Sequence, residues 1–384
     1  MTRMTCKERL LAAIRHEEPD LVPVSPRTWA WELEYYGSES WLYHLRAARE
    51  FDFDPLVTVS NPCTNYVESL RAGYDELHDI RVHLDIERAA SCTRVSRTIE
   101  TPAGRLSDRT LTPKPNTGYG ASPNPHWEER LVKGSKDLPA LAFLVAEPSP
   151  AQYLDVAALQ DEVGERGLVQ VYISSPIDHY AGWSMDLEDL MVASLRQPEF
   201  LAALLRLFQD MILAQTRCAL EAGVKVIFTP WYFASASVGW SPTFYQRFIL
   251  PLVREQVMLV HSGGGLYHYY DDGKLMGILP WLAEAGVDLL STLPPPPTGD
   301  TDLRLAKMLV GDRICLNGNI DVVNVIKAGT PDSVRATVRQ AILDAAPGGG
   351  FILGTSDSIR DAPQENVVAY FQAARRYGNY RHLG

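Results

Sequence analysis

Short apolar runs alternate with stretches of helical period along most of the chain. Six runs rich in β-branched and aromatic residues are predicted to be strands, at 168–174, 224–229, 265–270, 287–293, 314–319 and 351–355. Apolar residues three and four positions apart predict the helices, at 186–195, 198–222, 241–259, 274–285, 302–309, 331–345 and 363–377. This alternation is typical of a parallel sheet covered by helices.

Two further strands precede this region and complete the predicted fold. Residues 21–24 follow an N-terminal helix, and residues 55–60 form another apolar run, which brings the count to eight. Eight strands that are each followed by a helix define the (β/α)8 or TIM barrel, and the chain length suits that fold. We therefore predict an α/β fold, a single TIM barrel over residues 1–384. An open, doubly wound sheet is the alternative.

An insertion is predicted between strands 2 and 3 of this barrel, roughly at residues 85–149. Within it, residues 93–112 alternate around a Pro-Ala-Gly turn, which is the pattern of a β-hairpin. Residues 113–125 are rich in proline, asparagine and glycine and are predicted to be a loop. No independent second core is expected in the insertion.

Charge and composition exclude several classes of protein. The formal net charge is -11, and the basic residues are scattered, whereas nucleic-acid binding needs a concentrated positive field. No segment has the ~20 apolar residues of a membrane span, and charges flank the short apolar patch near the N-terminus. We expect a cytoplasmic protein that binds neither nucleic acid nor membrane. The five cysteines are widely spaced, so neither disulfides nor a thiolate zinc site is predicted.

The candidate site follows from the predicted barrel, because catalytic groups lie at the carboxyl ends of its strands. Residues expected there include Arg27, Trp29, Trp31, Glu32, Asn61, Cys63, Asn65, Asp178, His179, Trp231, Tyr232, His268, Tyr270, Asp271, Asp272, Asn317 and Asp357. The abundance of aromatic groups suits a planar or methylated small molecule, including a cationic one. We expect the substrate to be bound by Arg27, Trp29, Trp31, Asp178, His179, Trp231, Tyr232 and Asn317.

The strongest chemical candidates are His268 and Asp357, from the fifth and eighth strands. An imidazole that converges with carboxylates can hold a divalent metal, or it can act as an acid and base without a metal. The sequence leaves both alternatives open.

The order of several motifs resembles the uroporphyrinogen decarboxylase superfamily. The motifs are TCKERLLAAIRHEEPDLVPV, EAGVKVIFTPWYFASASVGWSPTFYQRFILPLV, LAEAGVDLLS, LNGNIDVVNVIKAGTPDSV and GGFILGTSDSIRDAPQENVVAYFQAARRYG. The chain is most similar to the methylcobalamin:coenzyme M methyltransferase branch. The resemblance implies a TIM barrel, zinc bound by a His-x-Cys pair and a later Cys, and a separate corrinoid protein as partner.

This sequence departs from those family patterns at two points. The positions that match the zinc ligands are His268, Tyr270 and Asp357, so both thiolates are replaced. The glycine- and arginine-rich loop by which the decarboxylases hold a tetrapyrrole reads PRTWAWELEYYG, with Arg27 as its one arginine. If a metal binds, His268 and Asp357 are its expected ligands, with Tyr270 as a phenol ligand or proton donor, and the site is harder than a thiolate site.

Three functions are predicted, in order. The first is an enzyme of this superfamily that transfers a methyl group between a small aromatic or methylated substrate and a corrinoid or thiol, with cobalamin on the partner protein. The second is a cofactor-independent decarboxylase or lyase, with His268, Asp357 and Tyr270 handling protons. The third is a barrel that binds a ligand without catalysis. A homodimer is compatible with each of them.

Overall fold

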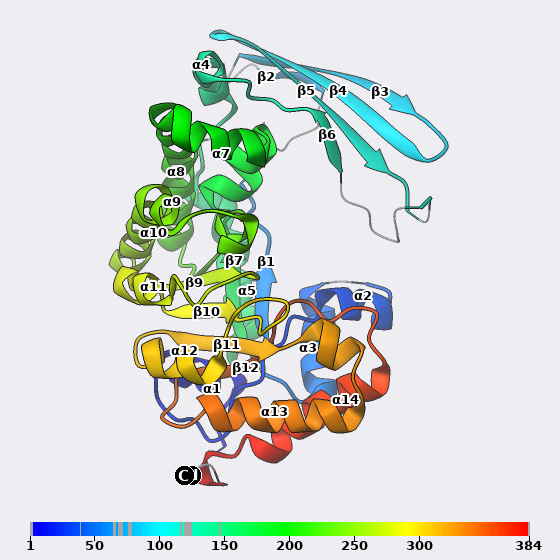
Figure 1. Cartoon of the computed structure of the whole chain (residues 1–384), viewed down its shortest axis with the longest axis vertical. Helices are drawn as coiled ribbons and strands as arrows, with labels where there is room; N and C mark the ends of the chain where they lie inside the picture. Colours follow the sequence, from blue (N-terminus) through cyan, green and yellow to red (C-terminus); the bar gives the residue numbers. More distant parts are fainter. Residues whose placement is uncertain are drawn as a thin grey trace. The chain divides into compact units, whose positions relative to one another are not determined.

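The computed structural model describes residues 3–38, 40–63, 67, 72–75, 79–115, 117–118, 125–145 and 147–382. The chain divides into two compact units, whose elements are labelled in Figure 1. Unit 1 comprises residues 1–61, 149–173 and 216–384, and unit 2 comprises residues 62–148 and 174–215. The prediction that residues 1–384 form one domain stays a prediction.

Unit 1 is built around a parallel sheet of seven strands in the order β1-β7-β8-β9-β10-β11-β12. The strands are β1 (Leu56–Val59), β7 (Leu168–Tyr172), β8 (Val226–Pro230), β9 (Leu266–Asp271), β10 (Leu289–Thr292), β11 (Cys315–Ile320) and β12 (Phe351–Thr355). Seven of the eight predicted strands are therefore confirmed, and neighbours in the sequence of these strands are neighbours in the sheet.

The eighth predicted strand, residues 21–24, is not a strand in the described part of the chain. It makes isolated bridges, of which the parallel one joins Val24 to Leu353 of β12. The backbone N–H of Leu353 donates to the carbonyl of Pro23, and that of Asp54 donates to the carbonyl of Val24. Pro23 has no backbone N–H and cannot donate to a ladder, which limits this segment to a few hydrogen bonds.

Helices of unit 1 follow most of its strands, largely as the apolar spacing predicts. They are α1 (Cys6–Ile14), α2 (Trp29–Tyr36), α3 (Trp41–Phe51), α5 (Leu154–Val163), α9 (Pro242–Phe244), α10 (Leu250–Ser262), α11 (Leu279–Ala285), α12 (Leu303–Val310), α13 (Pro331–Ala345) and α14 (Gln364–Tyr377). Helices α2 and α3 were not predicted from the sequence. Among the described residues, no helix is long and apolar enough to cross a membrane.

The N-terminal ends of the strands are sealed by α1. Leu10, Ala13 and Ile14 of this helix form one apolar cluster with the first or second residues of the strands, which are Leu168, Val226, Leu289, Cys315 and Ile352. Leu56 and Leu266, the first residues of β1 and β9, pack against the same cluster. Burial of these side chains closes one end of the sheet, so the space inside it opens toward the carboxyl ends of the strands.

Alternate residues of β9 serve two different environments. Tyr267 and Tyr269 point toward the helices, where the hydroxyl of Tyr267 accepts from the indole N–H of Trp231 (2.9 Å) and donates to the amide oxygen of Gln256 (3.0 Å). The ring of Tyr269 stacks on Trp231 with centroids 6.0 Å apart. His268 and Tyr270 therefore face the opposite side of the sheet.

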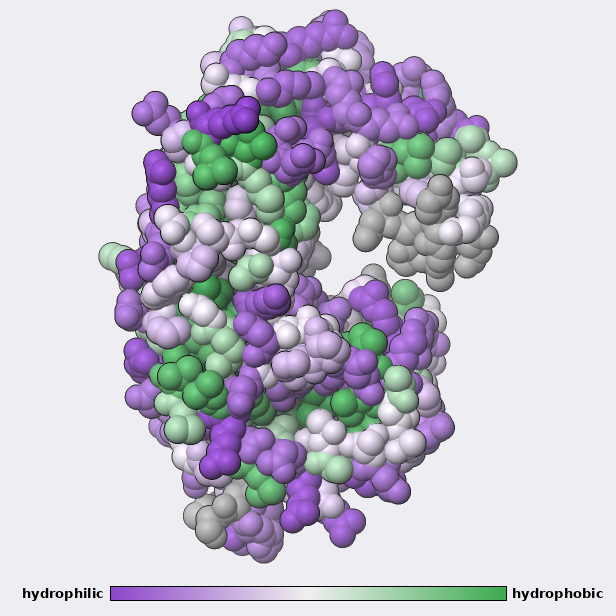
Figure 2. Space-filling view, viewed as in Figure 1, coloured by the Kyte–Doolittle hydropathy of each residue, from purple (hydrophilic) through white to green (hydrophobic). Residues whose placement is uncertain are grey.

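Unit 2 contains a five-stranded antiparallel sheet in the order β2-β3-β4-β5-β6. Its strands are β2 (Gly73–Asp75), β3 (Ile80–Arg88), β4 (Cys92–Thr101), β5 (Gly104–Pro113) and β6 (His126–Glu129). The predicted hairpin is present, because β4 pairs with β5 and Thr101 faces Gly104 across the turn. The predicted loop at 113–125 lies partly outside the described residues. The visible surface of these strands is mostly hydrophilic (Figure 2).

Unit 2 also contains two helices that were predicted as part of the barrel, α7 (Leu187–Arg196) and the first part of α8 (Pro198–Glu221). The short helices α4 (Leu138–Leu141) and α6 (Gly182–Ser184) of the same unit were not predicted. A buried ion pair between Arg97 of β4 and Asp108 of β5 lies within the antiparallel sheet. The additional strands β2, β3 and β6 were not predicted. β2 and β6 are only three and four residues long, whereas β3 alternates apolar and polar residues (IRVHLDIER), a strand signal that was overlooked.

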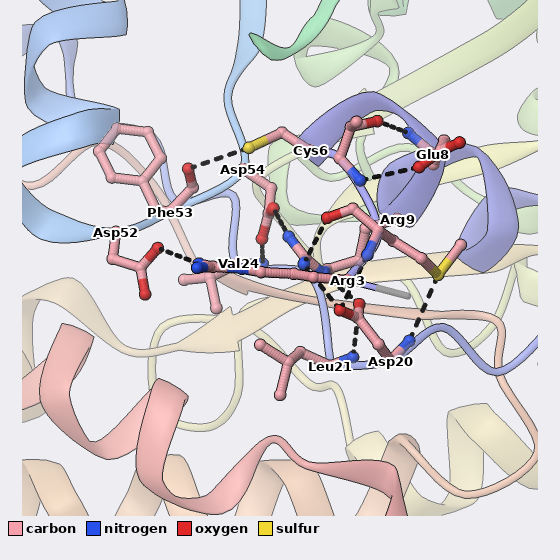
Figure 3. Close-up of polar contacts among 12 residues, drawn as sticks. Arg3, Cys6, Glu8, Arg9, Asp20, Leu21, Val24, Asp52, Phe53 and Asp54 are labelled. Carbon is pink, nitrogen blue, oxygen red and sulfur yellow. Dashed lines mark hydrogen bonds and ion pairs between the residues drawn. The ribbon is translucent and has the colours of Figure 1, made fainter. Parts of the chain in front are cut away.

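A buried ionic network fixes α1 to the segment before β1 (Figure 3). The guanidinium of Arg9, only 3% exposed, donates to the carboxylates of Asp54 at 2.5 Å and Asp20 at 2.8 Å. The other carboxylate oxygen of Asp54 accepts from the backbone N–H of Val24 (3.0 Å) and from Arg375 of α14 (3.1 Å). These contacts hold residues 20–25, which lead directly to the candidate site.

Candidate functional site

A cavity of about 400 Å³ lies inside the parallel sheet of unit 1. In β7 to β11 its lining residues begin at the third position of the strand, beyond the apolar cluster formed with α1, whereas β1 also contributes its first two residues, Leu56 and Val57. Residues of α2, α3 and the segment before α2 form the rest of its wall. The lining includes Ser25, Arg27, Thr28, Trp29, Glu32, Trp41, His44, Thr58, Gln170, Tyr172, Phe228, His268, Tyr270, Ser291 and Asn317.

His268 is held by hydrogen bonds at both ring nitrogens. Nδ1 lies 2.7 Å from the amide oxygen of Gln170, and Nε2 lies 2.7 Å from the hydroxyl of Ser291. The amide nitrogen of Gln170 donates to the hydroxyl of Thr58 at 2.7 Å, so its amide oxygen faces the imidazole. An amide oxygen only accepts, which places the ring proton on Nδ1 and makes Nε2 an acceptor. The sequence analysis did not identify Gln170 or Ser291.

Burial keeps this imidazole neutral. Loss of water, reinforced by the positive charge of Arg27, lowers the pKa of His268 from 6.5 to about 3. His268 is 3% exposed, and its ring lies 4.7 Å from that of Phe228. The site therefore presents an uncharged imidazole throughout the neutral range of pH.

This low pKa gives a testable dependence of stability on pH. Between pH 6.5 and pH 3, the unfolded chain binds a proton at His268 that the folded chain does not, so stability falls as the pH decreases. We expect His268 to account for about 2 kcal/mol of the loss in unfolding free energy between pH 7 and pH 5. Urea denaturation of the wild type and of His268→Gln at both values measures it. If the free energy of unfolding falls by the same amount between pH 7 and pH 5 in both proteins, the assignment is refuted, whatever their absolute stabilities.

Arg27 supplies a cation to the cavity. Its guanidinium carbon lies 4.2 Å from the centre of the Tyr270 ring, a cation–π arrangement. Among the described residues, its Nη1 is buried and has no hydrogen-bond partner. Burial raises the pKa of the Tyr270 phenol well above its ordinary value of 10, although Arg27 acts in the opposite direction. The phenol therefore stays protonated, and it donates to Asp272 at 3.3 Å.

Glu32 and His44 form a second polar group on the wall. The buried carboxylate of Glu32 lies 2.6 Å from Nδ1 of His44 and accepts a hydrogen bond from the hydroxyl of Thr28 at 2.5 Å. Nε2 of His44 is buried, with no hydrogen-bond partner among the described residues. The sequence analysis missed His44 because it did not predict α3.

The structure brings six of the residues expected at the strand ends together. They are Arg27, Trp29, Glu32, His268, Tyr270 and Asn317, which all line the cavity. Trp29 remains 44% exposed at its edge, whereas Asn317 is buried.

The other predicted residues of unit 1 lie away from the cavity lining. Trp31 is buried against Tyr35 and Phe51, and Trp231 is buried in the helical layer behind β9. Tyr232 meets Tyr270 edge to face with centroids 6.2 Å apart. Asp357 is partly exposed, and it accepts from the backbone N–H of Ser358 at 2.6 Å. Its roles as catalyst and ligand stay predictions.

Two further predicted residues, Asp178 and His179, belong to unit 2. Asp178 is buried in the π-helical turn Pro176–Ala181, and the backbone of His179 belongs to the same turn. Asn65 lies outside the described residues. Substrate contacts of Asp178 and His179 stay predictions.

The described residues do not fit the implied metal site. Both nitrogens of His268 are engaged by Gln170 and Ser291, which leaves no lone pair for a metal ion. Within the described ranges, no three His, Cys, Asp or Glu side chains form a group that could hold a metal. Tyr270 faces the guanidinium of Arg27, an arrangement that disfavours a second cation beside its ring.

Comparison with known proteins agrees with this architecture. The chain belongs to the uroporphyrinogen decarboxylase (URO-D) family, because the family model matches residues 120–377, more than half of its length. A methyltransferase from Methanosarcina mazei has a similar fold, with a TM-score of 0.67 and 18% identity over 97% of this chain and 99% of that chain.

Two curated relatives show the range of activities in the family. A uroporphyrinogen decarboxylase from Trichodesmium erythraeum is 25% identical over 50% of this chain and 51% of its own length. A methylated-thiol–coenzyme M methyltransferase from Methanosarcina mazei is 26% identical over 51% of this chain and 50% of its own length. The chain thus spans about half the length of these relatives, and the likeness supports an enzyme of the URO-D family.

Proposed function

We propose that this chain is a URO-D family enzyme that transfers a methyl group to or from a small aromatic or methylated substrate held in the cavity of unit 1. The observation that carries the proposal is the cavity itself, about 400 Å³ with aromatic walls and one guanidinium. This volume is near the lower end of the range for small-molecule sites. Relatives named methyltransferases favour the reaction.

Different residues of the lining bind different parts of the substrate. The rings of Phe228, Tyr270 and Trp29 supply apolar surface that excludes water, and Arg27 attracts an anionic group of the substrate. The same guanidinium stabilises negative charge on a leaving oxygen when a methyl–oxygen bond breaks. A tetrapyrrole with many carboxylates is a poor match, because Arg27 is the one Arg or Lys in the described lining.

Cobalamin and its carrier belong to the proposal as co-reactants. A corrinoid would supply or accept the methyl group, and we propose that a separate corrinoid protein carries it.

The closing of the sheet into an eight-stranded barrel is also proposed. Residues 23–25 would be its eighth member, between β12 and the start of β1, because hydrogen bonds join them to both.

Methyl transfer is tested with free cobalamin. The purified chain is incubated with reduced cobalamin and a panel of methoxybenzoates, N-methylated aromatics and methylated thiols, and the absorbance of methylcobalamin is followed. We expect methylcobalamin to form with at least one aromatic donor, and to form far more slowly in Arg27→Met. An absence of transfer across the panel would contradict the proposal.

A cofactor-independent decarboxylase is the second candidate, and the placement of Arg27 favours it. A buried guanidinium with a free N–H can hold a substrate carboxylate, and the protonated Tyr270 phenol beside it can donate a proton. Release of carbon dioxide from hydroxybenzoates or arylacetates without cobalamin would establish this reaction in place of methyl transfer. Binding of these acids without turnover would instead leave a binding barrel.

A further inference from the structure

The hydrogen-bond chain through His268 fixes the direction of each of its bonds. The amide oxygen of Gln170 can only accept, so His268 donates from Nδ1 and accepts at Nε2. The partner of Nε2 at 2.7 Å is the hydroxyl of Ser291, which must therefore be the donor. A serine hydroxyl has one proton, and here that proton is used in the hydrogen bond to His268.

The remaining capacity of Ser291 is therefore that of an acceptor. Ser291 is 4% exposed and lines the cavity, and no described residue donates a hydrogen bond to its Oγ. A buried hydroxyl of this kind leaves two lone pairs for a bound molecule. A group that brings another lone pair to this point is repelled, whereas an N–H or O–H group is accepted.

We propose that Ser291 determines specificity by accepting a hydrogen bond from the substrate, and that the cavity selects small planar acids that also carry a hydroxyl or amino group. The proposal rests on the proposed function for the site. The acid group is assigned to Arg27, whose buried Nη1 lacks an acceptor, and the planar body to the aromatic wall that includes Phe228 and Tyr172. The donor group is distinct from the group that gains or loses methyl.

The alternative use of Ser291, as a nucleophile activated by His268, is disfavoured by the same contacts. The neutral amide of Gln170 cannot stabilise an imidazolium as a carboxylate would, and His268 is buried beside Phe228, its register neighbour on β8. The chain of hydrogen bonds orients Ser291 but gives it little tendency to lose its proton.

Matched ligands test the proposal. The 2-, 3- and 4-hydroxybenzoates are compared with the corresponding fluorobenzoates, because fluorine is close to hydroxyl in size and cannot donate. Calorimetry should show at least one hydroxybenzoate binding about tenfold more tightly than its fluoro counterpart. Ser291→Ala should abolish this difference. Ser25→Ala is the matched control, since Ser25 lines the same cavity and its hydroxyl accepts from the backbone of Leu56, and it should keep the difference.

Two results would overturn the proposal. One is an equal or greater affinity for every fluorobenzoate, and the other is a preference for hydroxyl that persists in Ser291→Ala. If no benzoate binds, the substrate class is wrong, and long-range ¹H–¹⁵N spectra of the ligand-free protein then decide the hydrogen-bond chain. The expected ring is neutral with its proton on Nδ1, and a proton on Nε2 would refute it.

The proposed function can fail independently of this inference. A protein that prefers hydroxybenzoates through Ser291 but transfers no methyl group would refute methyl transfer alone. A protein that transfers methyl groups while binding fluoro and hydroxy acids equally would refute only the role of Ser291.

Discussion

Replacing Arg9 by alanine is expected to lower the free energy of unfolding by about 3–5 kcal/mol, the largest single effect that we anticipate. The substitution leaves the carboxylate of Asp54, which is fully buried, without its nearest cation. Arg375 remains at 3.1 Å from the other carboxylate oxygen and keeps part of the compensation. Urea denaturation at neutral pH measures the change. The network also holds residues 20–25, which lead directly to the residues that line the cavity, so ligand binding should weaken as well.

Arg3→Ala is the matched control for this experiment. Arg3 pairs with Asp52 at 3.7 Å, but the Arg3 side chain is 77% exposed, and exposed pairs contribute ~1 kcal/mol or less. A loss of similar size in both variants would show that burial does not decide the contribution of Arg9.

The same network predicts acid sensitivity. Burial raises the pKa of Asp20, but the hydrogen bond and charge of Arg9 outweigh it, and the net pKa lies below the ordinary 3.8. A lowered pKa contributes stability that is present above the unfolded value and is lost as the pH falls through the folded one. Below about pH 4 the wild type should therefore lose stability more steeply than Arg9→Ala. A steeper loss in the variant would contradict this account.

Arg27→Met is expected to weaken binding of an aromatic carboxylate by about 30- to 100-fold. The substitution removes the cation that lies over Tyr270 but keeps an unbranched, flexible side chain at this position. Benzoate and benzamide distinguish charge from shape. The wild type should prefer benzoate, and Arg27→Met should bind both weakly and almost equally, as measured by calorimetry.

Although Arg27→Met should weaken binding, it should not destabilise the ligand-free protein. A buried N–H without a partner costs free energy in the ligand-free protein, so Arg27→Met should unfold at the same temperature as the wild type or higher. Arg360→Met is the matched control, because that guanidinium also lies over an aromatic ring, Trp29, at 5.4 Å, but is exposed. A loss of benzoate affinity in Arg360→Met equal to that in Arg27→Met would remove Arg27 as the anion-binding group.

The strands of the parallel sheet could be predicted from sequence because they are buried on both faces. Runs such as FILGT, and LVQVY apart from Gln170, are apolar segments bounded by turn residues. Two helices escaped prediction. α2 is rich in aromatic residues and has a low helix propensity, and α3 begins after a serine cap whose signal was not recognised. The segment at 21–24 has the composition of a strand, but its proline restricts it to a few bonds.

The site could be predicted only in part, for a physical reason. Position at a strand end identified Arg27, His268, Tyr270 and Asn317, since parallel strands bring their ends together. The role of His268 depends on Gln170, which lies 98 positions earlier in the chain. A polar residue in the middle of a buried strand is the one signal that could have drawn attention to Gln170.

The alternation along β9 separates two kinds of evolutionary change. Tyr267 and Tyr269 belong to the packing between sheet and helices, where a substitution affects folding, whereas His268 and Tyr270 line the cavity. A mutation at one of the latter positions changes the lining of the cavity directly. This strand is therefore a point at which a family of shared architecture can acquire new substrates one residue at a time.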